Sequence, residues 1–170
     1  MVEPAPVLPQ KPVTPPLPRS APRAVDKASV PAQTRSIDEL YQLAKAAADQ
    51  ERWSEALKWL DQAEAVGKFH PQIYYLRAVI QWHTGRVSEA VASLRQAIFC
   101  NPGFALAQYT LGELYHEIGD AQSAVRHWRL AQVALMSQPP HERLAFADEL
   151  TVEMLLGLLK HRLNMLPMRK

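Results

Sequence analysis

Small and apolar residues recur along the middle of this chain at a fixed interval. Alanine stands at positions 56, 90 and 124, which are 34 residues apart, and similar residues surround each of the three. A period of this length is typical of arrays of paired helices. The pattern predicts six helices, near 37–50, 53–66, 71–84, 87–100, 104–118 and 121–136.

Aligned at this period, the three segments 37–70, 71–104 and 105–138 share five columns. These are Ala44/Ala78/Gly112, Tyr41/Tyr75/Tyr109, Ala56/Ala90/Ala124, Leu60/Leu94/Trp128 and Ala63/Ala97/Ala131. The small residues allow the two helices of a unit to approach closely, because a bulky side chain there would overpack the contact. Larger residues are expected to fill the remaining gaps: Leu40, Leu43, Tyr74, Leu111 and Tyr115 on first helices, and Trp53, Leu60, Leu94 and Trp128 on second helices.

Residues at the predicted helix ends agree with this period. Ser36 and Glu39 have the spacing of a capping box, which starts the first helix near residue 37. Pro71 opens the second unit, where its missing N–H costs nothing, and Asn101-Pro102 precedes the third. Glycines are expected to end helices in the left-handed conformation at three positions: 67, 85 and 119.

This combination of period, columns and caps resembles the tetratricopeptide repeat (TPR) family. The resemblance implies an all-α fold in which residues 36–138 form a right-handed superhelix of three helix-turn-helix repeats. Residues 139–170 are expected to follow as a loop and a C-terminal capping helix. Apolar residues of the last helix, about 151–164, share one face: Val152, Leu155, Leu156, Leu159 and Leu163, with Phe146 and Leu150 helping to seal the array. A partner-binding role for that helix is the alternative to capping.

Residues 1–35 differ in composition from the remainder. They hold nine of the fourteen prolines and neither glycine nor an aromatic residue. Such a stretch buries little apolar surface, so we expect an extended or disordered linker. Five basic and two acidic residues give it a net charge of +3, which leaves −1 for residues 36–170. The near-neutral folded part argues against a nucleic-acid partner.

The sequence lacks the patterns that carry chemistry. No glycine-rich phosphate loop occurs, the six histidines form no metal-ligand spacing, and Cys100 is the only cysteine. We therefore expect no catalytic site, no cofactor and no metal. Without a long apolar run or an export signal, the prediction is a cytoplasmic protein with no membrane insertion.

In TPR arrays the first helices line a concave groove, and the resemblance places fifteen residues there, at positions 2, 5, 9, 12 and 13 of each repeat. We expect a peptide or helix to bind among eight of them: Tyr41, Lys45, Tyr75, Trp82, His83, Tyr109, Glu113 and His116. Aromatic residues supply much of the energy at such interfaces, although the tyrosines could instead fill gaps between neighbouring helices. Tyr41 and Lys45 stand where TPR clamps for acidic chaperone tails carry Lys and Asn, so the principal ligands of such a clamp are missing.

The third repeat is similar to a narrower family. Residues 101–107, 111–115, 119–120, 124–128 and 131, followed by 146–148 and 150–152, resemble the C-terminal TPR region of bacterial chemoreceptor methyltransferases. In that family a proline-rich linker joins the repeats to an S-adenosylmethionine-dependent domain, which has no counterpart here.

The resemblance implies a non-catalytic interaction module of a chemosensory system. Its partner would be a chemoreceptor, a response regulator or a methyltransferase domain. The first alternative is a TPR assembly factor or chaperone of a secretion or pilus system, and self-association through the last helix is a further one.

Overall fold

The computed structural model describes residues 35–144 and 149–165, and these ranges hold seven α-helices and no strand. The helices are α1 (Ile37–Asp49), α2 (Trp53–Val66), α3 (Pro71–His83), α4 (Val87–Cys100), α5 (Ala105–Glu117), α6 (Ala121–Leu135) and α7 (Val152–Met165). The all-α prediction is confirmed, and the six repeat helices begin and end within one residue of the expected positions. Two predictions fall outside the described residues: the linker over 1–35, of which only Arg35 is described, and the sealing role of Phe146.

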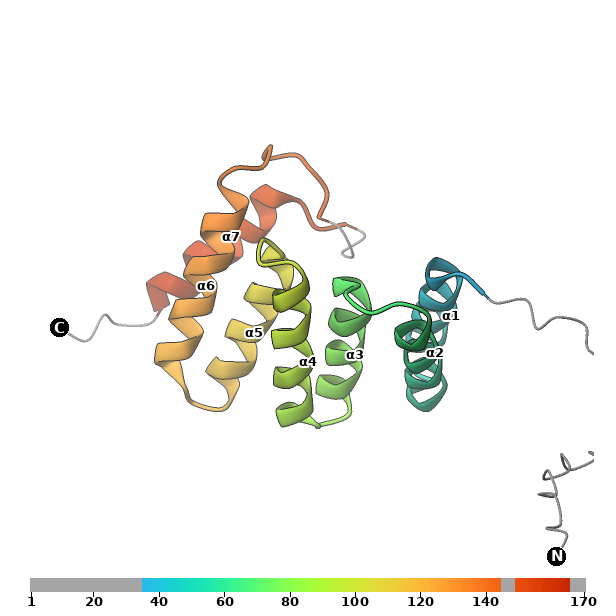
Figure 1. The fold of residues 1–170 in the computed structure, drawn as a ribbon. Helices are drawn as coiled ribbons and strands as arrows, with labels where there is room; N and C mark the ends of the chain where they lie inside the picture. The colour runs from blue at the N-terminus through green and yellow to red at the C-terminus, as the bar shows by residue number, and fades with distance from the viewer. Residues whose placement is uncertain (1–34, 145–148, 166–170) are drawn as a thin grey trace, which may run out of the picture. The chain divides into compact units, whose positions relative to one another are not determined.

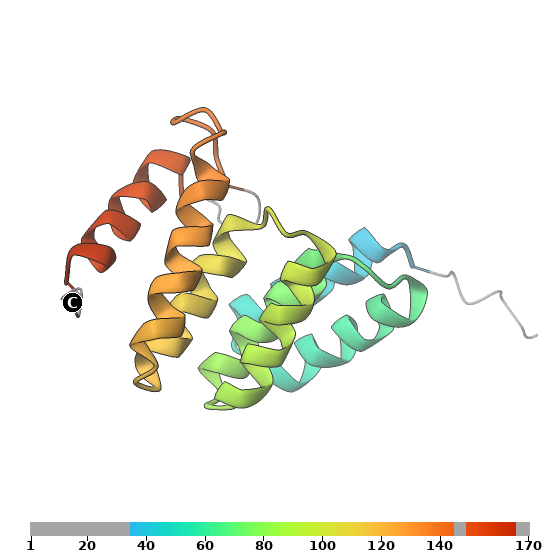
Figure 2. The ribbon, with the colours of Figure 1, turned by 60° about the vertical axis from the view of Figure 1, so that its left-hand side comes forward.

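The helices pair in chain order. α1 packs on α2, α3 on α4 and α5 on α6, and α7 then packs on α6 (Figure 1). The same succession of hairpins is visible from a second direction in Figure 2. This arrangement is the predicted helical superhelix of three hairpins with one further helix at its C-terminal end.

The turn residues act mostly as predicted. Ser36 Oγ accepts a hydrogen bond from the Glu39 N–H at 3.2 Å, and Glu39 Oε2 accepts one from the Ser36 N–H at 2.9 Å, so the capping box is present. Gly85 and Gly119 have φ of +74° and +83°, as left-handed caps require. Gly67 was wrongly predicted to do the same.

Gly67 ends α2 in an extended conformation, with φ −158°. The left-handed residue of this loop is Phe69, at φ 73°. A Cβ at position 67 would lie 2.5 Å from Ile37 Cδ1, the tip of a side chain that would have to move aside. The chain therefore turns toward α3 two residues later than expected.

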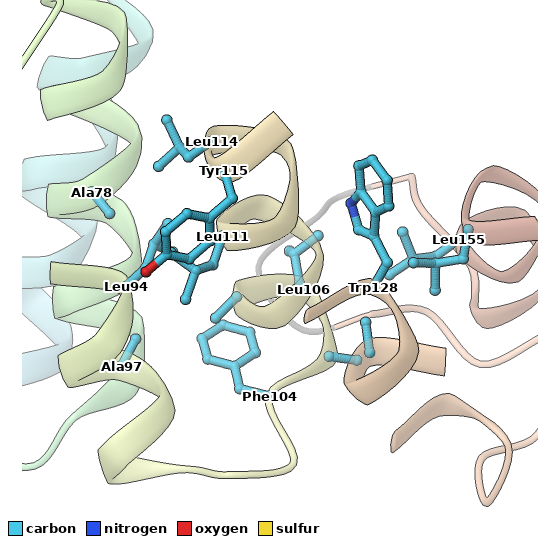
Figure 3. Packing of buried hydrophobic residues seen from close by; sticks show 14 of the residues in the cluster. Ala78, Leu94, Ala97, Phe104, Leu106, Leu111, Leu114, Tyr115, Trp128 and Leu155 are labelled. Atoms are coloured by element: carbon cyan, nitrogen blue, oxygen red, sulfur yellow. The ribbon is translucent and has the colours of Figure 1, made fainter. Parts of the chain in front are cut away.

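Position 7 of each repeat shows how successive hairpins meet. In the third repeat it is Leu111, which is fully buried in the cluster that also holds Leu94 of the preceding second helix (Figure 3). In the second it is Arg77, which pairs with carboxylates of α2. In the first it is Leu43, which is 37% exposed. Leu43 was expected to fill a gap, but within the described residues no helix precedes α1 to cover it.

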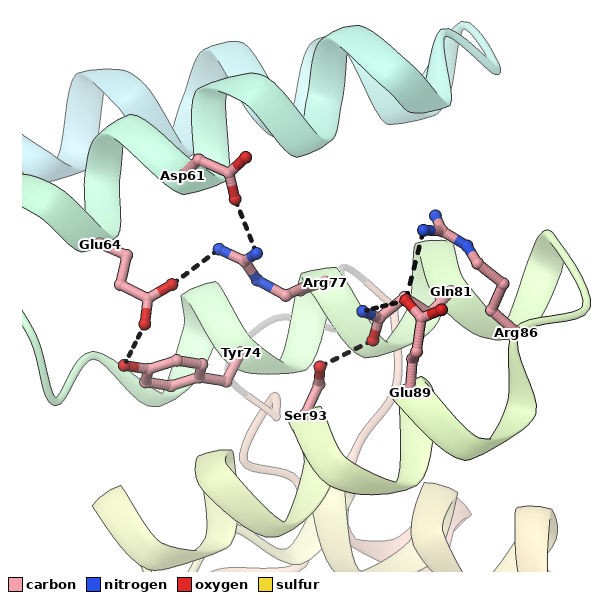
Figure 4. A network of polar contacts seen from close by, with 8 residues as sticks. All are labelled: Asp61, Glu64, Tyr74, Arg77, Gln81, Arg86, Glu89 and Ser93. Atoms are coloured by element: carbon pink, nitrogen blue, oxygen red, sulfur yellow. Dashed lines mark hydrogen bonds and ion pairs between the residues drawn. The ribbon is translucent and has the colours of Figure 1, made fainter.

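The joint between α2 and α3 adds polar contacts to its apolar ones. Arg77 donates to Asp61 Oδ1 at 2.7 Å and to Glu64 Oε2 at 2.9 Å, and the Tyr74 hydroxyl donates to Glu64 Oε1 at 3.2 Å (Figure 4). The buried apolar residues form two clusters that divide within α3. Ile73 and Ile80 belong to the cluster of α1 and α2, and Tyr74 and Ala78 belong to the larger one that extends to α7. The hairpins therefore meet through chemically different joints.

The third hairpin has a different pair of residues at the contact between its two helices. Where the other repeats pair Ala with Leu, this one pairs Gly112 with Trp128. A Cβ on Gly112 would lie 2.4 Å from Trp128 Cδ1, so glycine at 112 makes room for the indole. Trp128 is fully buried, and its Nε1–H finds no acceptor among the described residues.

Helix α7 covers the end of the array, as predicted for a capping helix. Leu155 is fully buried in the cluster that contains Trp128 (Figure 3). Val152 and Leu159 are fully buried in the same cluster, while Leu150 and Leu156 pack against it. Backbone hydrogen bonds fix the approach to α7, including one from Leu144 N–H to Leu150 O at 2.9 Å. No helix in the described part of the chain has the length and apolar character needed to cross a bilayer.

Candidate functional site

The side chains predicted to form a groove lie on α1, α3 and α5, and we call this set the first-helix face. Two hydrogen bonds cross it between α3 and α5. The Tyr75 hydroxyl lies 3.4 Å from Thr110 Oγ1, and the Trp82 indole N–H donates to Glu117 Oε2 at 2.7 Å. Because both bonds join neighbouring first helices, they fix the two aromatic side chains relative to α5.

The three tyrosines differ in their burial. Tyr41 is only 9% exposed, whereas Tyr75 and Tyr109 are half-buried. The ring of Tyr75 packs 5.2 Å from that of Phe104, and burial raises the Tyr75 pKa. Tyr75 thus fills the gap between first helices and still presents part of its ring. Lys45 is half-buried on α1.

Two predicted histidines contact second helices. His83 is exposed and stacks on Trp53 of α2, with ring centroids 5.7 Å apart. His116 is exposed and lies 5.6 Å from the Trp128 ring of α6. Their rings therefore do not extend the aromatic set formed by Tyr75, Trp82 and Tyr109.

Glu113 on α5 holds an arginine from the last helix. Its Oε2 accepts from Arg162 Nη2 at 2.5 Å, and the two side chains are 12% and 35% exposed. Burial raises the pKa of the adjacent Tyr109, the Glu113 carboxylate raises it further, and Arg162 lowers it in part. Although burial alone would lower the Arg162 pKa, Glu113 and Tyr109 raise it overall. The three side chains form one polar cluster at the α5 end of the first-helix face.

The sequence argument did not identify Arg162 or Thr110 as parts of this face. Arg162 lies 49 residues beyond Glu113. A signal was present, however, because Arg162 follows the buried Leu159 by three residues and so falls on the packed side of α7. A basic residue in that place needs an acidic partner on the surface it covers.

We expect Arg162→Ala to lower the free energy of unfolding by about 1–2 kcal/mol, because it leaves the largely buried Glu113 carboxylate unpaired. The estimate is below that for a fully buried pair since Arg162 is 35% exposed. Urea denaturation followed by circular dichroism measures the change. Lys160→Ala, an exposed neighbour on the same helix, is the control and should change stability by less than about 0.5 kcal/mol. Equal losses for the two variants would contradict a specific role for Arg162.

Groups that could support other chemistry are few. No set of three or more His, Cys, Asp or Glu side chains in the described ranges is placed to hold a metal ion. Cys100 is half-buried, and burial raises its pKa, which disfavours the reactive thiolate.

Comparison with known proteins places these helices in context. Residues 41–103 match the tetratricopeptide repeat family. A stretch of 75 residues is 35% identical to the TPR repeat-containing thioredoxin TTL4 of Arabidopsis thaliana. That stretch covers 44% of this chain but only 11% of the plant protein, so the chain spans about a tenth of that relative's length.

Similar folds occur among solved structures. The type III secretion translocator chaperone SycD of Yersinia enterocolitica has a TM-score of 0.64 at 15% identity, covering 76% of this chain and 89% of its own. PcrH in complex with the chaperone binding region of PopB has a TM-score of 0.63 at 15% identity, and the match covers 74% of this chain and 93% of PcrH. The Sgt2 TPR domain of Aspergillus fumigatus has a TM-score of 0.58 at 18% identity, and the match covers 79% of this chain and 85% of the Sgt2 domain.

At these identities the structures show a shared fold and nothing of function. None of the three is a chemoreceptor methyltransferase, and that narrower resemblance stays a prediction. Residues 41–103 therefore match tetratricopeptide repeats, and the described helices share the fold of the solved TPR domain of Sgt2.

Proposed function

We propose that this chain is a protein-interaction module that holds a segment of a partner protein on its first-helix face, as an assembly factor or chaperone of a secretion-type system. TPR folds bind proteins or peptides, and PcrH was solved with the chaperone binding region of PopB. The likeness to the secretion chaperone SycD, and to PcrH bound to a chaperone binding region, supports this assignment over the chemosensory one. Type III secretion is the system of SycD, and for this chain only the broader class of assembly factor or chaperone is proposed.

The observation that carries the proposal is the fixed aromatic set on α3 and α5. Trp82 and Tyr75 are half-buried, and each is tied to α5 through its polar atom, at 2.7 Å and 3.4 Å. Side chains ordered before binding lose little conformational entropy when a partner arrives. Partly exposed aromatic rings with satisfied polar atoms are therefore suited to anchor a peptide.

A chemosensory role is the second candidate, and the sequence of the third repeat favours it. The proline-rich stretch at 1–35 would then lead from a methyltransferase domain, and the repeats would dock it near a receptor or a regulator. Copurification of the tagged chain from its native cell separates the two candidates. Secretion or pilus components would favour the first, and receptor or methyltransferase peptides would favour the second.

We expect the double change Tyr75→Ala, Trp82→Ala to weaken binding of the copurified partner by about 30-fold or more, since truncating an interface anchor costs about 2 kcal/mol. Isothermal titration calorimetry measures the affinity, and circular dichroism checks that the helices persist. Phe99→Ala is the matched control, because Phe99 is a 75% exposed aromatic residue on a second helix. Unchanged affinity in the folded double variant would remove the first-helix face as the binding surface.

A further inference from the structure

The polar cluster of Tyr109, Glu113 and Arg162 differs from the remainder of the first-helix face because it already contains a cation. Arg162 of α7 forms an ion pair with Glu113, which shows that the carboxylate accepts a guanidinium. Only Glu113 Oε2 takes part in that ion pair; Oε1 is buried and has no well-formed hydrogen-bond donor among the described residues. A guanidinium that engaged both oxygens would satisfy the carboxylate more fully than Arg162 does.

The surroundings of Glu113 favour the same class of ligand. Tyr109, Glu113 and Glu117 are spaced four residues apart and so follow one stripe of α5. Glu117 is exposed and orients the Trp82 indole. An arginine bound at Glu113 would lie near a second carboxylate one helical turn away and near aromatic rings, both of which attract a guanidinium.

The fifteen positions of the first-helix face are acidic as a whole. They include four carboxylates, on Asp38, Asp49, Glu113 and Glu117, and a single lysine, Lys45. Complementary charge would speed the encounter with a basic segment and orient it. The occupant that the face favours is therefore basic.

We propose that the partner segment carries an arginine that replaces Arg162 on Glu113, so that the Tyr109–Glu113–Glu117 stripe is a subsite for a basic side chain. The inference rests on the proposed function and adds the chemical class of the partner. Arg162 is then a competitor within the same molecule: it satisfies the carboxylate until a partner arrives and leaves as the partner's guanidinium binds. Its side chain is 35% exposed, so part of it already contacts solvent.

The probe is a short peptide with arginines in an alanine background, titrated into the full chain and followed by nuclear magnetic resonance. Shifts are expected in the amides of residues 109–117 and in the Trp82 indole N–H, whose acceptor is Glu117. The same peptide with glutamine in place of arginine should produce none of them, and added salt should weaken the binding. Equal shifts with the glutamine peptide, or shifts confined to other carboxylates, would overturn the proposal.

Two variants separate competition from structural support. Arg162→Gln should tighten binding of the arginine peptide by about tenfold, which corresponds to removal of an internal competitor of about 1.4 kcal/mol. Arg162→Lys should resemble the unaltered chain, and Glu113→Gln should abolish the shifts. Unchanged or weaker binding by Arg162→Gln would show that Arg162 only supports the fold. Loss of this subsite would leave binding by Tyr75 and Trp82 intact, so the two proposals fail separately.

Discussion

Gly112→Ala is expected to lower the free energy of unfolding by about 2–3 kcal/mol, although alanine is the better helix former by about 1 kcal/mol. The added Cβ would lie 2.4 Å from Trp128 Cδ1 and 2.5 Å from its Nε1. Trp128 is fully buried, so its indole cannot move aside without displacing the side chains packed around it. In a domain of this size the melting temperature should fall by about 8–12 °C, which differential scanning calorimetry measures.

The matched controls test whether the loss comes from this contact. Gly157→Ala, in the interior of α7 with nothing within 4 Å of the new Cβ, should stabilise the protein by about 0.5–1 kcal/mol. In a Trp128→Leu background, Gly112→Ala restores the Ala and Leu pairing of the other repeats and should also stabilise. A Gly112→Ala change that destabilises equally with Leu at 128 would rule out the indole as the cause.

Leu155→Ala should destabilise the protein by about 2–5 kcal/mol and release the C-terminal helix. Leu155 is fully buried in the cluster that contains Trp128, so truncation removes contacts that fasten α7 to the last hairpin. The uncovered end of the array would then expose apolar surface, which promotes association between copies. Hydrogen exchange reports the release of α7, and light scattering reports the mass in solution.

Leu158→Ala is the corresponding control on the same helix. Leu158 is 44% exposed, so its truncation should cost less than about 1 kcal/mol and leave α7 protected. If Leu155→Ala left α7 as protected from exchange as it is in the unaltered chain, α7 would not depend on the apolar contact for its position.

The repeat period predicted the helices well because each column has a local cause. Small residues fix the contact within a hairpin, and caps fix the ends, so six helices and the last one could be located from the sequence. What differs between hairpins was harder to predict. Leu43, Arg77 and Leu111 share one position, but the neighbouring second helix decides whether each is exposed, ion-paired or buried.

The candidate site was predicted less completely for the same reason. Its positions on α3 and α5 follow from the repeat, and Tyr75, Trp82 and Tyr109 lie on that face. The partners of those residues come from other segments: Arg162 reaches Glu113 from α7, and the rings of His83 and His116 meet tryptophans of second helices. Contacts between distant segments depend on how hairpins stack, which one repeat cannot specify.

Because Arg77 of α3 pairs with Asp61 and Glu64 of α2, the second hairpin is matched to the first and cannot be exchanged freely with the third. A copy of the third hairpin inserted after the first would set Leu111 where Arg77 now lies, so Asp61 and Glu64 would lose their cation and Glu64, the less exposed of the two, would face an apolar side chain. The same copy added behind an apolar second helix would meet no such penalty. Duplication or shuffling of these units is therefore tolerated only at joints whose chemistry matches.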